Sequence, residues 1–463
     1  AGETTTLNLQ SARVSELGTG ITAGLTATGD FAATVGALSQ MKSGDLIING
    51  VQIGGANQNA DTGSTEGKIS SAAAKADAIN AKSAEPGVRA VVGETVMQGS
   101  AMTAGAATGT VTINGVDINV ATKADAAETR ADLVAVINDH AAQTGVRAID
   151  TGDDKRGIQL VAADGRNIVV DLGTVTAAQT GLKVGAQTGS YSLVAEAGRT
   201  VSIGSTDKGN IGNAGLATGT FDRGVSYVST DARGVTGAAL AAGDLVINGI
   251  SIRGSSTKDD TASSVNSEMS GIAIANAINA SSEQTRVKAF ANSLSIGGTG
   301  ITAADVGGDI EINGVTIGLT TVAADGDAVT LGKVIDAINN YKDATGVVAR
   351  ENAEGGLTLT AADGRNITVD SADFSLAQIG LTGATVGGTS TAYALADTAY
   401  STVTLESAKT INVSGGANGV GGSFASAKFE EGSYGSNSGG LKVGDIDVST
   451  QAGATAALDA ITA

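Results

Sequence analysis

The sequence contains no cysteine and no tryptophan, and it has one proline (Pro86) and one histidine (His140). Without cysteine there is no disulfide framework, no thiolate nucleophile and no cysteine-ligated metal site. A single histidine excludes a zinc centre with several histidine ligands in one chain, and it leaves a Ser/His/Asp triad only one candidate base. We therefore predict that the chain is not an enzyme and that it uses no cofactor and no catalytic metal.

Aromatic residues are also scarce, at 3% of the chain, so hydrophobic cores must be built from Ala, Val, Ile and Leu. The net charge is −19, which argues against nucleic acid as a partner. A membrane span needs about 18 or more consecutive apolar residues, and because no such run occurs we expect no membrane insertion. The first residues, AGETTTLNLQ, lack the basic-then-apolar layout of a cleaved signal peptide.

Glycine, by contrast, is abundant, with 67 of 463 residues, and its positions reveal internal repeats. The tripeptide Ile-Asn-Gly starts at Ile48, Ile113, Ile247 and Ile312. The two members of each pair are 65 residues apart, and the second pair follows the first after 199 residues. The hexapeptide AADGRN starts at Ala162 and again 199 residues later, at Ala361. A block of two related units is therefore duplicated, and we number the four units in chain order.

Each Ile-Asn-Gly predicts a β-hairpin, because Asn-Gly is a favoured two-residue turn in which both residues tolerate positive φ. The predicted turns are Asn49–Gly50, Asn114–Gly115, Asn248–Gly249 and Asn313–Gly314. In this register one face of every hairpin is entirely aliphatic, which indicates period-2 burial. Its members are Leu46, Ile48, Val51, Ile53, Val111, Ile113, Val116, Ile118, Leu245, Ile247, Ile250, Ile252, Ile310, Ile312, Val315 and Ile317.

A helical stretch follows each hairpin, most clearly with Leu331, Val334, Ile335 and Ile338 on one helix face. Each stretch ends in Ile-Asn, at Asn80, Asn138, Asn279 and Asn339, and a further strand follows at 88–92, 146–149, 287–290 and 347–350. The second unit of each pair then has a predicted second hairpin, with turns at Asp164–Gly165 and Asp363–Gly364. The predicted fold class is α+β: duplicated pairs of small ββαβ units, each an antiparallel sheet covered by one helix, with β-rich connecting segments.

A second repeat, VAEAGRTVSIGS from Val194 and TLESAKTINVSG from Thr404, has an offset of 210 residues and is strand-like. It suggests the following division. Residues 25–190 hold the first pair of units, 191–225 a β-rich connection, 226–390 the second pair, and 391–440 a β-rich return with a Gly/Ser-rich loop. Residues 1–24 and 441–463 are short end segments, the latter with the start of a helix.

Few residues suggest chemistry. His140 lies near a predicted helix end without a recurring partner, and we interpret it as a partly covered side chain. The pattern G-x-G-x-x-A occurs at Gly18–Ala23 and Gly298–Ala303, but without the strand and helix of a phosphate-binding loop we interpret it as a connection. A hard-cation site remains a minor alternative. Three asparagines also have the sequence pattern of a glycosylation acceptor. The cation candidates are Asp164, Asp171, Asp363 and Asp370 with Asn167 or Asn366, and the acceptors are Asn279, Asn366 and Asn412.

The units resemble the flagellin IN motif, through GDLIINGVQI, GDLVINGISI, TGVRA and GGLTLTAADGRNITVD. The end, DIDVSTQAGATAALDAITA, is similar to the point where a flagellin chain re-enters its core domain, and TLNLQSARVSELGTGITAG to the stretch that leaves it. This resemblance implies the surface-exposed, variable outer region of a structural subunit of the bacterial flagellar filament, exported by the flagellar apparatus and extracellular.

The same resemblance implies other flagellin subunits as partners, mainly through core helices of which only end segments occur here, and surface glycans as possible partners. We expect that the chain does not form the filament core by itself. Two alternatives stay open: a carbohydrate-binding, adhesin-like module, and a flagellar cap or hook-associated protein. An inserted metalloprotease is disfavoured, because its HExxH helix needs two histidines.

Overall fold

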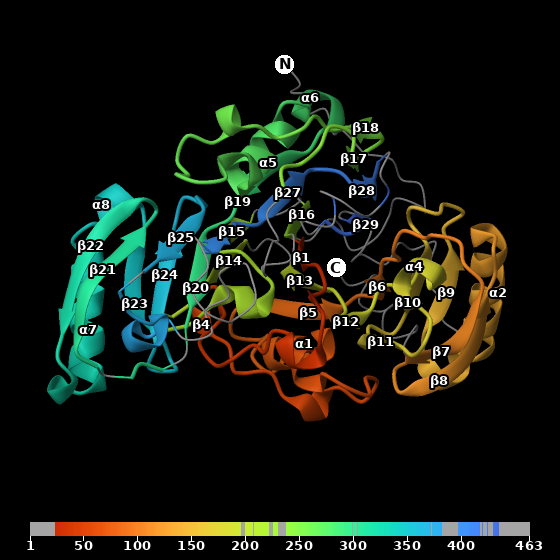
Figure 1. Cartoon of the computed structure of the whole chain (residues 1–463), viewed down its shortest axis with the longest axis horizontal. Coiled ribbons are helices and arrows are strands. Elements are labelled where there is room, and N and C mark those ends of the chain that lie inside the picture. The colour runs from red at the N-terminus through yellow and green to blue at the C-terminus, as the bar shows by residue number, and fades with distance from the viewer. Residues whose placement is uncertain are drawn as a thin grey trace, which may run out of the picture.

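The computed structural model describes residues 24–195, 200–206, 208–221, 226–229, 238–298, 300–302, 304–371, 373–381, 397–416, 419, 424 and 429–434. The end segments predicted at 1–24 and 441–463 lie outside the described residues except for Gly24. Within the described residues the chain forms several small, mostly antiparallel sheets and a few helices (Figure 1). The α+β class is therefore confirmed at this level. No helix in the described part combines the length and the apolar character of a membrane span.

The helices are short, and some of them begin at side-chain caps. Ser71 accepts the Ala74 N–H at the start of α1, and Asp125 accepts the Glu128 N–H at the start of α2. The α-helices are α1 Ala72–Asn80, α2 Ala126–Asp139, α3 Ala141–Thr144, α4 Ala177–Thr180, α5 Gly271–Asn279, α6 Ser282–Thr285, α7 Asp327–Asn339 and α8 Lys342–Thr345. The 3-10 helices are η1 Val35–Ala37, η2 Gln58–Ala60, η3 Lys68–Ser70, η4 Ile211–Ala214, η5 Thr257–Asp259, η6 Ser267–Met269, η7 Ala323–Asp325 and η8 Leu376–Ile379.

A six-stranded sheet in the order β19-β27-β16-β1-β13-β5 lies at the centre of the molecule (Figure 1). Its strands are β1 Gly24–Ala27, β5 Val88–Val92, β13 Tyr191–Ala195, β16 Ser226–Ser229, β19 Lys288–Ala291 and β27 Val403–Ser407. The two halves of the chain meet in it through β1 and β16, which pair in parallel, whereas the other neighbours pair antiparallel.

The central sheet is covered on opposite faces in its two halves. Leu25 and Leu193 lie opposite each other and belong to the core that includes residues of α1. Val228 and Leu405 also pair, but they belong to the core that includes residues of α5. Because Leu25 lies opposite Tyr227, Val228 faces the other side of the sheet. The repeated halves are thus packed on the two sides of one shared sheet.

Each Ile-Asn-Gly hairpin lies in an outer sheet. In the first and third units these sheets have the orders β15-β14-β3-β4 and β18-β17-β28-β29. Their strands are β3 Ile47–Ile48, β4 Val51–Gln52, β14 Val201–Gly204, β15 Gly219–Phe221, β17 Leu245–Ile247, β18 Ile250–Ser251, β28 Ile411–Gly415 and β29 Gly432–Tyr434. The segments expected as β-rich connections therefore supply strands that pair with the hairpins.

The second and fourth units each contain two sheets. The second has β2-β12-β11-β7-β8 and β6-β10-β9, and the fourth has β22-β21-β25-β26 and β20-β24-β23. In the second unit the strands are β2 Phe31–Ala32, β6 Thr95–Met97, β7 Ala107–Ile113, β8 Val116–Thr122, β9 Arg147–Asp150, β10 Ile158–Ala162, β11 Ile168–Leu172 and β12 Gly185–Gln187. In the fourth they are β20 Leu294–Gly297, β21 Val306–Ile312, β22 Val315–Thr321, β23 Val348–Glu351, β24 Leu357–Ala361, β25 Ile367–Asp370 and β26 Asp397–Ala399.

The order ββαβ occurs along the chain, but the strand after each helix does not join the sheet of its hairpin, contrary to the predicted unit. β5 and β19 lie in the central sheet, and β9 and β23 lie in three-stranded sheets. The cause is that the inner strand of each hairpin pairs with a strand from much later in the chain: β14, β11, β28 or β25. The helices α2 and α7 then contact strands of two sheets, β8 with β9 and β22 with β23, instead of covering one sheet.

The second hairpins predicted at Asp164–Gly165 and Asp363–Gly364 are also replaced. β10 pairs with β6 and β9, whereas β11 pairs with β7 and β12, so both edges of each strand are already occupied. The Asp-Gly pair still makes a turn, with a φ of 75° at Gly165 and a Gly165 N–H donated to the Ala162 carbonyl at 3.2 Å. This turn carries the chain from one sheet to the other.

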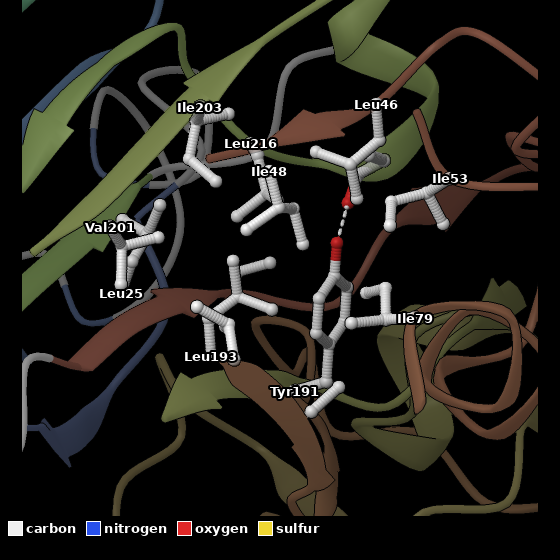
Figure 2. Close-up of a cluster of buried hydrophobic side chains, with 14 of the residues drawn as sticks. Leu25, Leu46, Ile48, Ile53, Ile79, Tyr191, Leu193, Val201, Ile203 and Leu216 are labelled. Carbon is white, nitrogen blue, oxygen red and sulfur yellow. Dashed lines mark hydrogen bonds between the residues drawn. The ribbon is translucent and has the colours of Figure 1, made fainter. Parts of the chain in front are cut away.

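The predicted aliphatic hairpin faces line the cores. In the first unit Leu46, Ile48 and Ile53 are fully buried, and they point toward Ile79 of α1 and Tyr191 of the central sheet (Figure 2). The residues that directly follow the turns are only half-buried; they are Val51, Val116, Ile250 and Val315. The Tyr191 hydroxyl donates to the Ala214 carbonyl, and burial raises the pKa of this phenol well above its usual value (Figure 2).

Candidate functional site: repeated asparagine contacts

The four Asn-Gly pairs connect the hairpin strands in a left-handed backbone conformation. The φ angles of Asn49, Asn114, Asn248 and Asn313 lie between 48° and 51°. Those of the following glycines, Gly50, Gly115, Gly249 and Gly314, lie between 78° and 81°. Two successive residues with positive φ are the geometry of a type I′ turn, which matches the twist of the strands that it joins.

The four asparagines of these turns, here called the turn asparagines, also form hydrogen bonds through their side chains. Each Nδ2 donates to a carbonyl beyond the following helix, and each Oδ1 accepts the N–H of a distant strand residue. The Nδ2 bonds run from Asn49 to Pro86 (2.9 Å), Asn114 to Thr144 (2.9 Å), Asn248 to Thr285 (2.7 Å) and Asn313 to Thr345 (2.8 Å). The Oδ1 partners are Ser202 (2.7 Å), Val169 (2.8 Å), Asn412 (2.8 Å) and Thr368 (2.8 Å).

The backbone N–H of each turn asparagine completes the contact. It donates to the carbonyl of the same distant residue, at 2.8 Å for Asn49 and Ser202 and at 2.9 Å for Asn114 and Val169. One carboxamide thus connects three segments: the turn, the segment that follows the helix, and a strand up to 164 residues away. We infer that the turn asparagines position the late strand against the hairpin.

A second set, the helix-end asparagines, closes the free edges of strands. Asn80 donates through Nδ2 to the Ala90 carbonyl at 2.9 Å and accepts the Ala90 N–H at 2.7 Å. The same pair of bonds joins Asn138 to Ala148, Asn279 to Ala289 and Asn339 to Ala349. These alanines lie in β5, β9, β19 and β23, each the last strand of its sheet. The side chain takes the place of a neighbouring strand at that position.

The AADGRN repeats join the two units of each pair. Arg166 forms a salt bridge with Asp164 at 2.7 Å, which lowers the pKa of that carboxyl, and Arg365 pairs with Asp363 in the same way. The Asn167 N–H donates to Ser64 Oγ at 2.8 Å in the loop before α1. The equivalent Asn366 N–H donates to Ser263 Oγ at 2.9 Å, before α5.

The other sequence candidates lie apart from one another. Asp171 and Asp370 are exposed on β11 and β25, and among the described residues no group of three or more His, Asp or Glu could hold a metal ion. The half-buried His140 has its Nδ1 2.8 Å from the Val136 carbonyl, between α2 and α3.

The described part of Gly298–Ala303 leads from β20 into β21, so no helix follows it, and Gly18–Ala23 lies outside the described residues. Of the three candidate glycosylation acceptors, Asn279 is a helix-end asparagine, Asn366 is buried and Asn412 is exposed.

Sequence reasoning selected the turn asparagines for their φ angles and missed their side-chain contacts. It also treated the helix-end asparagines only as polar residues near a helix end. A signal was present, because in all four units an alanine follows the helix-end asparagine after ten residues. A fixed spacing of one polar and one small residue across four copies indicates a paired contact.

Comparison with known proteins places these contacts in context. No family model matches the chain. Flagellin B from Helicobacter pylori strains 26695 and J99 is in each case 33% identical over 175 residues, which is 38% of this chain and 32% of the relative. The chain thus matches about a third of the length of these curated relatives.

Among solved structures, the flagellar cap protein FliD from Helicobacter pylori aligns over 75% of this chain and 82% of that one, with 12% identity and a TM-score of 0.13. This likeness is too low to support an argument from the fold. The chain is therefore similar to a flagellin in part of its sequence.

Proposed function

We propose that this chain is the surface-exposed outer part of a flagellin-like subunit of the bacterial flagellar filament, and that its role is structural. The observation that carries the proposal is the similarity to flagellin B over 175 residues. The same proposal gives an extracellular location, and neighbouring subunits of the filament as partners.

The internal geometry supports a structural role over a catalytic one. The polar side chains that recur in all four units, the turn asparagines and the helix-end asparagines, are engaged in hydrogen bonds to backbone groups. Such bonds fix strands in place, which is a structural use of these side chains. The net charge of −19 suits a surface that faces solvent.

We further propose that the four hairpins are copies of the flagellin IN motif, arranged as a duplicated pair. The spacing of 199 residues between equivalent Ile-Asn-Gly sites supports this, as do the matching asparagine contacts in both halves. In this view the Asn of the motif is retained because one side chain serves both the turn and the pairing of a late strand.

The proposal can be tested on intact cells of the organism that carries this sequence. Antibodies raised against the purified chain are applied to whole cells, and gold-conjugated secondary antibody is located by electron microscopy. An outer part of the filament subunit should be labelled along the whole filament. Preimmune serum and a strain in which the gene is deleted serve as controls.

The position of the label separates the candidates. Label confined to the distal tip would overturn the proposal in favour of a cap protein, and label confined to the filament base would favour a hook-associated protein. Label on the cell body alone would contradict a flagellar role. Label along the filament in wild-type cells, lost on deletion, would support the outer part of the subunit.

A further inference from the structure

Among the described strands that end a sheet, two are longer than all the others. β8 and β22 are seven-residue strands that each form the end of a sheet. In the described structure no strand pairs with their outer sides, whereas β5, β9, β19 and β23 are closed by helix-end asparagines. The two hairpins lie toward opposite ends of the long axis (Figure 1).

Hairpin geometry identifies the free backbone groups. Val315 pairs with Ile312 across the two-residue turn, and Ile317 pairs with Ile310, so these residues direct their backbone N–H and C=O groups toward β21. The backbone N–H and C=O groups of the alternate residues, Thr316, Gly318 and Thr320, therefore point away from β21. In β8 the equivalent positions are Asp117, Asn119 and Ala121. We call the first three residues the β22 edge and the second three the β8 edge. An open edge of this kind offers a template for another strand.

The two edges differ in charge. After β8, Lys123 forms salt bridges with Asp132 (2.6 Å) and Glu128 (3.7 Å) on α2, so this end is strongly polar. Val322 occupies the same position after β22, and Val329 is the third residue of α7, as Glu128 is of α2. These valines are 45% and 51% exposed. The copy in the fourth unit has thus exchanged an ion pair for exposed aliphatic surface.

The β22 edge is also self-complementary. The segment from Thr316 to Thr320 is Thr-Ile-Gly-Leu-Thr, which has the same residue classes in both directions. Antiparallel pairing with an identical strand, centred on Gly318, places Thr opposite Thr and Ile opposite Leu, and cross-strand pairs of this kind stabilise sheets. The segment carries no charge in a chain of net charge −19. In the β8 edge the same operation places Asp117 opposite Ala121.

We propose that the β22 edge is an interface at which two copies of this chain pair as antiparallel strands, with Val322 and Val329 covered in the dimer. Identical strands that pair about a two-fold axis satisfy both open edges at once, and the result is a closed dimer. The charged groups near this interface include Asp309 and Glu311 on β21, which lie opposite Gly318 and Thr316, Asp327 on α7, and Lys333, which is paired with Asp325 at 2.6 Å. This inference does not depend on the flagellar role.

The first experiment measures the mass of the purified chain by sedimentation equilibrium from micromolar to near-millimolar concentration. The wild-type chain should show a reversible monomer–dimer equilibrium. Thr320→Lys should remove the dimer, because an edge lysine blocks strand addition, whereas Ala121→Lys at the equivalent position of β8 should leave it unchanged. Both positions are exposed on edge strands, and unchanged thermal unfolding checks that the variants fold.

A monomer at all concentrations would overturn the proposal, and so would a dimer that survives Thr320→Lys. Equal loss in Ala121→Lys would contradict the assignment to β22.

A second experiment uses the absence of natural cysteine. A Cβ at position 318 would meet only Asp309 Oδ1, at 3.6 Å, so Gly318→Cys is tolerated. Facing residues of a hydrogen-bonded antiparallel pair have Cα atoms about 5.5 Å apart, within disulfide range. Under mild oxidation Gly318→Cys should form a covalent dimer and Asn119→Cys should not. Equal cross-linking of the two variants would contradict a specific β22 pairing.

Discussion

Apart from the central sheet, the two halves of the chain form ion pairs with each other at two equivalent places, and the charges at these places are reversed. In one, Arg156 in the loop between β9 and β10 forms a salt bridge with Glu431 at 2.8 Å and donates to the Gly415 carbonyl. In the other, acidic residues lie at the end of β23 and in the loop between β23 and β24. Glu351 pairs with Lys208 at 2.9 Å, and Glu354 pairs with Lys42.

The contacts also differ in burial. The Arg156 and Glu431 side chains are 25% and 15% exposed, whereas those of Lys208 and Glu351 are 54% and 47% exposed. The asparagine contacts, by contrast, are the same in both halves. Duplication has therefore retained the side chains that pair with backbone groups, which are buried around Asn114 and Asn313, because an unpaired buried donor or acceptor is costly anywhere in the fold. Surface charge carries no such penalty and has diverged.

The largest expected effect is the loss of a turn asparagine. Asn114→Ala and Asn313→Ala should each lower the free energy of unfolding by about 2–4 kcal/mol, because they leave buried backbone groups unpaired and place alanine at positive φ. Chemical denaturation followed by circular dichroism measures this, and Asn114→Gly, which removes only the hydrogen bonds, should cost less. Clearly unequal losses for the two alanine variants would contradict the equivalence of the halves.

A smaller effect is expected at the contacts between the halves. Arg156→Met should destabilise by about 1–3 kcal/mol, because it leaves the half-buried Glu431 and the Gly415 carbonyl without this partner. Glu351→Gln at the exposed contact should cost about 0–1 kcal/mol. The same denaturation experiment compares them. If Glu351→Gln were the more damaging change, burial would not be what distinguishes the two contacts.

The smallest effect concerns a pair that only the second half has. Arg253 donates to Asp259 and, by hydrogen bonding, lowers the pKa of that carboxyl from its usual 3.8 to about 2. The equivalent positions in the first half are Gly54 and Ala60. A lowered folded pKa stabilises the protein above pH 3.8, and this contribution is lost as the pH falls toward about 2.

Titration of the Asp259 carboxyl by NMR tests this, with Arg253→Gln as the comparison. The midpoint should rise toward 3.8 in the variant. An unchanged midpoint would exclude Arg253 as the cause.

The hairpins were predictable from sequence because their determinants are local: two residues with positive φ and alternating aliphatic residues beside them. The helices were predictable for the same reason, from the stripe around Val334. The strands that pair with the hairpins were not predictable. Ile48 pairs with Ile203 of β14, and nothing in the sequence near either residue specifies the other. Pairing over such separations is decided by the global packing.

The Asp-Gly turns illustrate the same limit at short range. Asp164–Gly165 makes a turn, as its residue types indicate, but the strands on either side already have neighbours such as β9 and β7. Local chemistry therefore specified that the chain turns and left open where it goes next. The asparagine contacts lay between these cases, since their spacing repeats in the sequence although their partners are distant.

The position of β1 in the middle of the central sheet has a mechanical consequence. Its four residues are hydrogen-bonded to β13 on one side and to β16 on the other. A pulling force applied at Gly24 along the strand loads both ladders in shear, so that their bonds must fail together instead of opening one by one. Drag transmitted through this strand would thus reach both halves of the molecule at the same time.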